Sequence, residues 1–90
     1  MTLKELLNGI EYKTTISLDT EVTDVTADSR KVTSGCAFVC VSGTRIDAHT
    51  FAASAFKNGA SVIIGERIVG DGLPNVIVKD CRVAYAVACA

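Results

Sequence analysis

Three short apolar runs divide the chain and predict three strands of a sheet. Residues 37–41 read Ala-Phe-Val-Cys-Val, and residues 61–64 and 76–78 are similarly rich in β-branched side chains. Runs without a polar alternation are typical of strands that are buried on both faces. Residues 21–27 instead alternate polar and β-branched side chains, which predicts an exposed or edge strand. A further brief strand is expected over residues 12–16.

Helical signals flank and separate these strands. Thr2 and Glu5 have the capping-box spacing ahead of a leucine-rich segment, which predicts a short first helix that ends at Gly9. A second helix is expected over residues 50–58. Its apolar face comprises Phe51, Ala52, Ala55 and Phe56. Asp80 can cap a last helix that runs from residue 81 onward.

This order of elements predicts an α/β fold, with a small mixed or mostly parallel sheet and flanking helices. Ninety residues suffice for one small domain. The last helix carries no charge after Arg82, whereas a surface helix shows a polar stripe. We therefore interpret residues 1–90 as the amino-terminal domain of a longer protein.

Composition narrows the class of protein. A chain that is 49% hydrophobic and 21% charged is typical of a globular core. The net charge of -1 offers no basic excess for a nucleic-acid partner. No signal peptide and no apolar stretch of about 18 residues is present, which indicates a cytoplasmic protein without a membrane span. The four cysteines form no C-x-x-C pair, so we expect reduced structural thiols, with a disulfide framework as the alternative.

Two loops carry the candidate chemistry. Ser29 follows the predicted edge strand, between Asp28 and Arg30, and its hydroxyl can donate to a phosphate or a base carbonyl. The alternative is an ordinary turn capped by Asp28, with Arg30 paired to a carboxylate such as Asp47. The segment 43–46, Gly-Thr-Arg-Ile, follows the buried strand 37–41, where ligands of open α/β sheets bind. The alternative there is a plain strand-to-helix connection.

Catalytic motifs are absent from the sequence. It contains no G-x-x-x-x-G-K-[ST] loop for a nucleoside triphosphate and no G-x-G-x-x-G fingerprint. No cluster of metal-ligating residues and no acid–base carboxylate pair is evident. We therefore assign no catalytic residue, no metal ligand and no cofactor to residues 1–90, which supply a binding surface instead.

The order and spacing of a longer set of residues resembles the amino-terminal UDP-binding domain of the Mur ligases, enzymes of bacterial peptidoglycan synthesis. The set comprises Asp28, Ser29, Arg30, Gly35, Phe38, Val39, Gly43, Asp47, His49, Phe51, Ala55, Gly59, Ala60 and Glu66. Together with residues 3–10 and 74–80 it covers nearly the whole chain. The segment 3–7 and the Asp-Ser-Arg form look most like the MurE branch, whereas Ala48 departs from it and keeps the MurF branch open.

The resemblance implies a function for the domain. It would bind the UDP moiety of UDP-N-acetylmuramoyl-L-alanyl-D-glutamate for an ATP-dependent amino-acid ligase that serves cell-wall growth, cell shape and cell division. The contact residues it implies are Ala27, Ser29, Thr44, Arg45 and Ile46. ATP, magnesium and the choice of added amino acid, diaminopimelate or lysine among others, would belong to the remaining ligase domains. The alternatives are the same domain of a MurF-type ligase, and a stand-alone nucleotide-binding or interaction module without catalysis.

Overall fold

A five-stranded mixed sheet forms the centre of the protein. The computed structural model describes residues 1–14, 16–41, 48–67 and 73–88. The strands are β1 (Tyr12–Thr14), β2 (Val25–Thr26), β3 (Ala37–Val39), β4 (Val62–Gly65) and β5 (Asn75–Val78), in the spatial order β1-β5-β4-β3-β2. Strands β2 to β5 are parallel, and β1 pairs antiparallel with β5. The predicted α/β fold with a mostly parallel sheet is confirmed.

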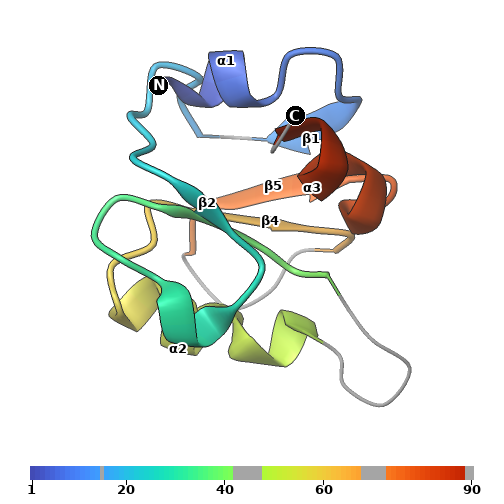
Figure 1. The fold of residues 1–90 in the computed structure, drawn as a ribbon. Helices are drawn as coiled ribbons and strands as arrows, with labels where there is room; N and C mark the ends of the chain where they lie inside the picture. The colour runs from blue at the N-terminus through green and yellow to red at the C-terminus, as the bar shows by residue number, and fades with distance from the viewer. Residues whose placement is uncertain (15, 42–47, 68–72, 89–90) are drawn as a thin grey trace.

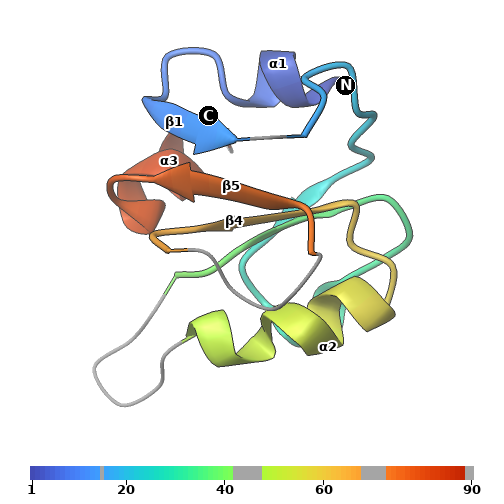
Figure 2. The ribbon, with the colours of Figure 1, turned by 180° about the vertical axis from the view of Figure 1, so that it is seen from behind.

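Helices lie on both sides of the sheet (Figures 1 and 2). The α-helices are α1 (Leu3–Leu6), α2 (Ala52–Lys57) and α3 (Cys81–Ala88), and the two short 3-10 helices are η1 (Ser29–Lys31) and η2 (Ala48–Phe51). Helix α2 lies on one side of the sheet, and α1 and α3 lie toward the other. This layering buries the sheet from both faces, as continuous apolar strands require.

The core follows the apolar runs of the sequence. Every residue of β3 and β4 is buried, and Phe38 and Ile63 are fully enclosed at facing positions of the two strands. Strand β2 lies at the edge of the sheet, as predicted, but covers two residues rather than the expected 21–27. The preceding residues bond elsewhere: Val22 N–H donates to Met1 O and Thr23 N–H to Gly35 O.

The predicted helix caps are observed, but the first helix ends at Leu6 and not at Gly9, which lies in the turn after it. The Thr2 hydroxyl accepts from Glu5 N–H at 3.3 Å, and the Glu5 carboxylate accepts from Thr2 N–H at 3.0 Å. Asp80 caps α3 by accepting from Arg82 N–H at 2.9 Å. Gly59 follows α2 with a φ of +116°, a conformation that strongly favours glycine.

The predicted apolar face of the second helix is only partly correct. Ala52 and Ala55 are buried, but Phe51 and Phe56 are 39% and 43% exposed. At 3.6 residues per turn, the two alanines lie at the centre of the buried stripe and the phenylalanines lie about 70° to either side of it. Small side chains at the centre let the helix approach the sheet, and the large rings remain partly exposed at the margins.

Candidate functional site

The four parallel strands end at one edge of the sheet, which we call the carboxyl edge. It comprises residues 27–31 after β2, 40–41 after β3, 66–67 after β4 and 79–80 after β5. Ligands of open α/β sheets bind outside such an edge. The turn after β2 and residues 40–41 after β3 both lie at this edge, because β2 and β3 are neighbours in parallel register.

Asp28 organises the turn that follows β2. Its carboxylate Oδ1 accepts from Arg30 N–H at 2.9 Å, and its carbonyl accepts from Lys31 N–H at 2.9 Å. The Thr26 hydroxyl accepts from Asp28 N–H at 3.1 Å, which connects the turn to the strand. The turn capped by Asp28 that the sequence left open as an alternative is therefore present.

Arg30 pairs with Asp28 through two hydrogen bonds. Arg30 Nε donates to Oδ1 at 3.2 Å and a terminal guanidinium nitrogen donates to Oδ2 at 3.1 Å. These bonds, with that from Arg30 N–H, lower the pKa of Asp28, and the carboxylate raises the pKa of Arg30. The Arg30 side chain is 88% exposed, so the pair contributes little to stability. The expected alternative partner, Asp47, lies outside the described residues.

Ser29 stands at the centre of this turn. Its residue is half-buried, and no hydrogen bond within the described part of the chain uses its hydroxyl. Ala27, two residues before it, is also half-buried. Ala27 and Ser29 therefore lie together at the carboxyl edge with a hydroxyl donor that no described partner takes. The other predicted contact residues, Thr44, Arg45 and Ile46, lie outside the described residues.

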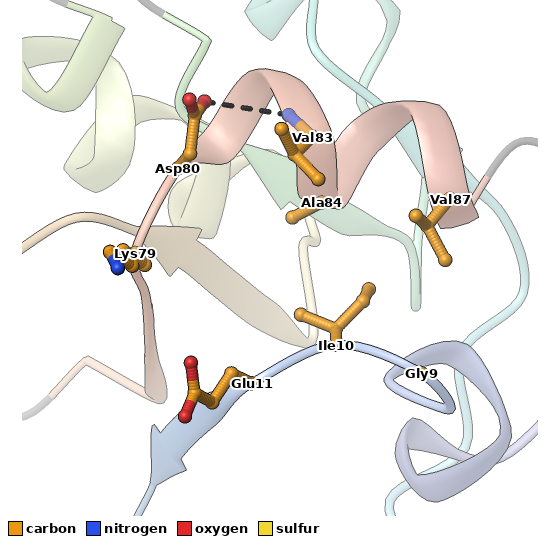
Figure 3. Close-up of a pocket in the computed structure, with 8 residues that line it drawn as sticks. All are labelled: Gly9, Ile10, Glu11, Lys79, Asp80, Val83, Ala84 and Val87. Atoms are coloured by element: carbon orange, nitrogen blue, oxygen red, sulfur yellow. Dashed lines mark hydrogen bonds between the residues drawn. The ribbon is translucent and has the colours of Figure 1, made fainter.

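A groove that sequence reasoning missed lies beside α3 (Figure 3). It has a volume of about 380 Å³ and is lined by Gly9, Ile10, Glu11, Lys79, Asp80, Val83, Ala84 and Val87. Val83 and Val87 are 60% and 40% exposed, and the side chains of both extend toward the groove. The uncharged end of the last predicted helix is the sequence feature that could have predicted this groove, because Val83, Ala84 and Val87 line it.

A polar hollow of about 320 Å³ adjoins this groove at the carboxyl edge. Glu66, Lys79, Asp80 and Arg82 line it, so its formal charges balance. The first backbone N–H groups of α3 are already bonded: Cys81 N–H donates to Glu66 at 3.0 Å, and Arg82 N–H to Asp80. With two carboxylates already at the helix terminus, this hollow does not favour an anionic ligand.

The three cysteines that the structure describes do not form a reactive centre. Cys36, Cys40 and Cys81 are buried and free, in agreement with the reduced-thiol interpretation. Burial, followed by the nearby charge of Glu66, raises the pKa of Cys81 to about 12, so its thiol stays protonated and unreactive at neutral pH. Among the described residues, no group of three or more His, Cys, Asp or Glu side chains could hold a metal ion. No helix in the described ranges is long and apolar enough to cross a membrane.

Sequence comparison relates most of the chain to ligases. Residues 21–85 match the family model described as "Mur ligase family, catalytic domain". The UDP-N-acetylmuramoyl-tripeptide–D-alanyl-D-alanine ligase of Escherichia coli K12 is 43% identical over 83 residues, which are 92% of this chain and 18% of that protein. The UDP-N-acetylmuramoyl-L-alanyl-D-glutamate–2,6-diaminopimelate ligase of Listeria monocytogenes is 38% identical over 87 residues, 96% of this chain and 18% of that protein.

Solved structures share the fold. The crystal structure of MurF from Acinetobacter baumannii matches with a TM-score of 0.81 and 33% identity, over 97% of this chain and 20% of that one. MurF from Thermotoga maritima, solved in complex with ADP, matches with a TM-score of 0.65 and 32% identity over 77% of this chain and 16% of that one. The chain thus spans about a fifth of the length of these proteins.

Proposed function

The chain belongs to the Mur ligase family, and from this premise we propose that residues 1–90 form the amino-terminal domain that binds the uridine diphosphate part of a UDP-N-acetylmuramoyl peptide. The observation that carries the proposal is the turn after β2. It holds Ser29 at the carboxyl edge of the sheet, with a hydroxyl that no described residue uses. A hydroxyl in this position can donate to a uracil carbonyl or a phosphate oxygen.

The remaining contacts belong to the same edge. We propose that Ala27 supports the ligand next to Ser29, and that Thr44, Arg45 and Ile46 complete the site from the loop after β3. The parallel pairing of β2 with β3 is what supports this grouping, because it brings the ends of both strands to one edge. A hydroxyl, a guanidinium group and backbone N–H donors match the acceptors of a nucleoside diphosphate.

In the full-length protein we propose an ATP-dependent ligase that extends the peptide of its substrate by one building block. The sequence has no phosphate loop for ATP, and the described part of the chain has no group of three or more His, Cys, Asp or Glu side chains that could hold magnesium. Those groups would bind to the remaining domains. This domain would hold the distant UDP end, and that binding energy would help to orient the reacting carboxyl group.

We propose the MurE type, which acts on UDP-N-acetylmuramoyl-L-alanyl-D-glutamate. The segment 3–7 and the Asp-Ser-Arg turn support it, as does the Listeria relative. A MurF type is the second candidate, because the Escherichia relative carries a D-alanyl-D-alanine ligase name and both structural matches reported above are MurF proteins. Ligation assays of the full-length protein with dipeptide and tripeptide substrates distinguish the two.

The site itself is tested by NMR titration of the 90-residue chain with UDP and with UDP-N-acetylmuramoyl peptide. We expect amide shifts that cluster at residues 27–30 and 43–49. ADP is the matched control, since it keeps the diphosphate and changes the base. Shifts that cluster at the α3 groove would move the site to residues such as Ile10 and Val83 and would refute the assignment.

A further inference from the structure

We propose that Asp28 is a positioning residue for the nucleotide, which acts by fixing the backbone of Ser29 rather than by touching the ligand. The inference rests on the proposed function, since it assigns a role within the same site. Asp28 is not one of the expected contact residues, which are Ala27, Ser29 and residues 44–46. The basis of the inference is the hydrogen bonding of one turn.

Two hydrogen-bonded rings enclose Ser29. The smaller ring closes where Asp28 Oδ1 accepts from Arg30 N–H at 2.9 Å, and Ser29 is its middle residue. The larger ring closes where the Asp28 carbonyl accepts from Lys31 N–H at 2.9 Å. A side-chain ring of this kind mimics a backbone turn and holds the enclosed residue in one conformation. The backbone of Ser29, and with it the direction of its Cα–Cβ bond, is thereby set before a ligand arrives.

Asp28 is itself held from both sides. The Thr26 hydroxyl accepts from Asp28 N–H at 3.1 Å and contacts its carbonyl at 3.4 Å, which ties the turn to the end of β2. The Arg30 guanidinium bonds both carboxylate oxygens, at 3.2 Å and 3.1 Å. These contacts orient the carboxylate toward Arg30 N–H. Preorganisation of this kind raises affinity because less conformational freedom is lost on binding.

A double-mutant cycle separates positioning from general structural support. UDP binding is measured by NMR titration for the natural chain, for Ser29→Ala, for Asp28→Ala and for the double variant. We expect Ser29→Ala to weaken binding about fivefold, the effect of one lost neutral hydrogen bond. Asp28→Ala should weaken it by a similar factor in the natural chain, and should have no further effect when Ser29 is already alanine.

Matched variants test the contribution of the hydrogen bond from Arg30 N–H to Asp28 Oδ1. Asp28→Asn keeps an oxygen acceptor and should bind nearly as the natural chain does. Arg30→Gln removes the exposed guanidinium and keeps the N–H, so it should lose much less affinity than Arg30→Pro, which removes the N–H and should lose about fivefold. Asp24→Ala is the control, because Asp24 accepts from Val25 N–H at 2.8 Å but lies before β2, at the opposite end of that strand. It should not change affinity.

The outcomes distinguish the two proposals. If the natural chain shows no UDP-dependent shifts at residues 27–30, the proposed function fails and the positioning role fails with it. If the natural chain binds but Asp28→Ala binds equally well, only the positioning role is wrong. Equal losses for Asp28→Ala with and without Ser29 would show that Asp28 acts independently of the hydroxyl, and would also overturn the inference. Should Asp28→Ala fail to fold, Arg30→Pro against Arg30→Gln decides the same question.

Discussion

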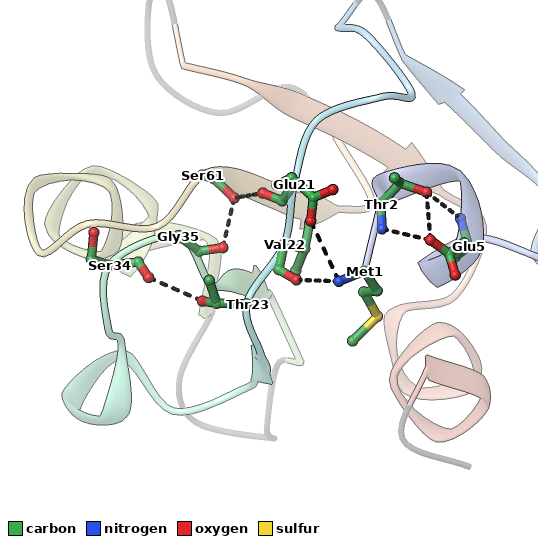
Figure 4. A network of polar contacts seen from close by, with 9 residues as sticks. All are labelled: Met1, Thr2, Glu5, Glu21, Val22, Thr23, Ser34, Gly35 and Ser61. Carbon is green, nitrogen blue, oxygen red and sulfur yellow. Dashed lines mark hydrogen bonds and ion pairs between the residues drawn. The ribbon is translucent and has the colours of Figure 1, made fainter.

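Two serines at opposite ends of the parallel strands use their hydroxyl groups differently. Ser61 lies at the amino edge, which we define as the residues that precede the parallel strands, and it donates to Gly35 O at 2.9 Å (Figure 4). It also lies 3.4 Å from the carbonyls of Glu21 and Cys36. Ser29 lies at the carboxyl edge, and no hydrogen bond within the described ranges involves its hydroxyl. The first hydroxyl joins segments of the fold, and we propose that the second binds the ligand.

The same contrast extends to the surroundings of each serine. At the amino edge the Thr23 hydroxyl donates to Ser34 O at 3.0 Å (Figure 4). Gly35 N–H donates to Gly59 O at 2.7 Å. These bonds join segments that are far apart in the sequence. At the carboxyl edge the bonds of Asp28 stay within a few residues. The bonds around Ser61 thus stabilise the fold, and those of Asp28 organise a local turn beside Ser29.

The largest expected effect is at Gly59, where the amino edge is most crowded. A Cβ atom there would lie 2.9 Å from Ser34 Cα, and the φ of +116° disfavours any side chain. Gly59→Ala should lower the free energy of unfolding by about 3 kcal/mol, at the upper end of the range for a strained backbone, because the contact must also be relieved. Urea denaturation measures it.

Gly9→Ala is the matched control for that experiment. Gly9 has a φ of +83°, but nothing lies within 4 Å of the position of its Cβ atom. Its substitution should lower the free energy of unfolding by about 1 kcal/mol, because only the unfavourable backbone conformation contributes. Equal losses at Gly9 and Gly59 would show that backbone conformation alone, and not the packing of the amino edge, decides the effect.

Ser61→Ala comes next and tests the amino-edge serine directly. We expect a loss of about 1 kcal/mol in the free energy of unfolding, because the hydroxyl that joins Gly35 O to β4 disappears. The affinity for UDP should not change, since Ser61 lies at the opposite ends of the strands from the proposed site. A variant as stable as the natural chain would remove the basis for calling this edge structural.

Ser29→Ala should show the reverse behaviour. Its stability should remain within about 0.5 kcal/mol of the natural chain, because the hydroxyl has no partner among the described residues. Its affinity for UDP should fall. Thermal unfolding and NMR titration of both serine variants give the comparison, and a clear loss of stability at Ser29 would contradict it.

The smallest effect concerns pH and two carboxylates, that of Asp28 at the carboxyl edge and that of Glu5 in helix α1. Hydrogen bonds from Thr2 lower the pKa of Glu5 below its ordinary value of 4.5, and bonds from Arg30 lower the pKa of Asp28 below 3.8. A lowered pKa in the folded state means stabilisation that is present above the ordinary value and lost as pH falls through the folded value. Both residues should therefore contribute to stability at neutral pH, and the contribution should vanish in acid.

Salt separates the two carboxylates. The Asp28 interaction is with a charged, largely exposed side chain, so its pKa should rise toward 3.8 at high ionic strength. The Glu5 interaction is chiefly with an uncharged backbone N–H and should respond less. Carbon-13 NMR titration of the carboxyl groups in low and high salt measures both values, and equal responses would argue against the distinction.

Local chemistry made much of the fold predictable. The capping box of Thr2 and Glu5, the cap at Asp80 and the buried strand around Phe38 depend on residues that are close in sequence, and the structure shows each of them. The Asp28 turn was also foreseen, as one of two alternatives, because its ring spans only three residues.

Contacts between distant segments were decided only by the tertiary structure. The sequence determined an α/β domain and a polar turn after β2, since the spacing of apolar residues and the capping of helices are local properties. It did not determine that Ser61 would reach Gly35, that Phe51 and Phe56 would flank α2 rather than face the sheet, or that Val83 would border a groove with Ile10. Each of these depends on how closely two distant elements pack, and that distance is a property of the assembled core.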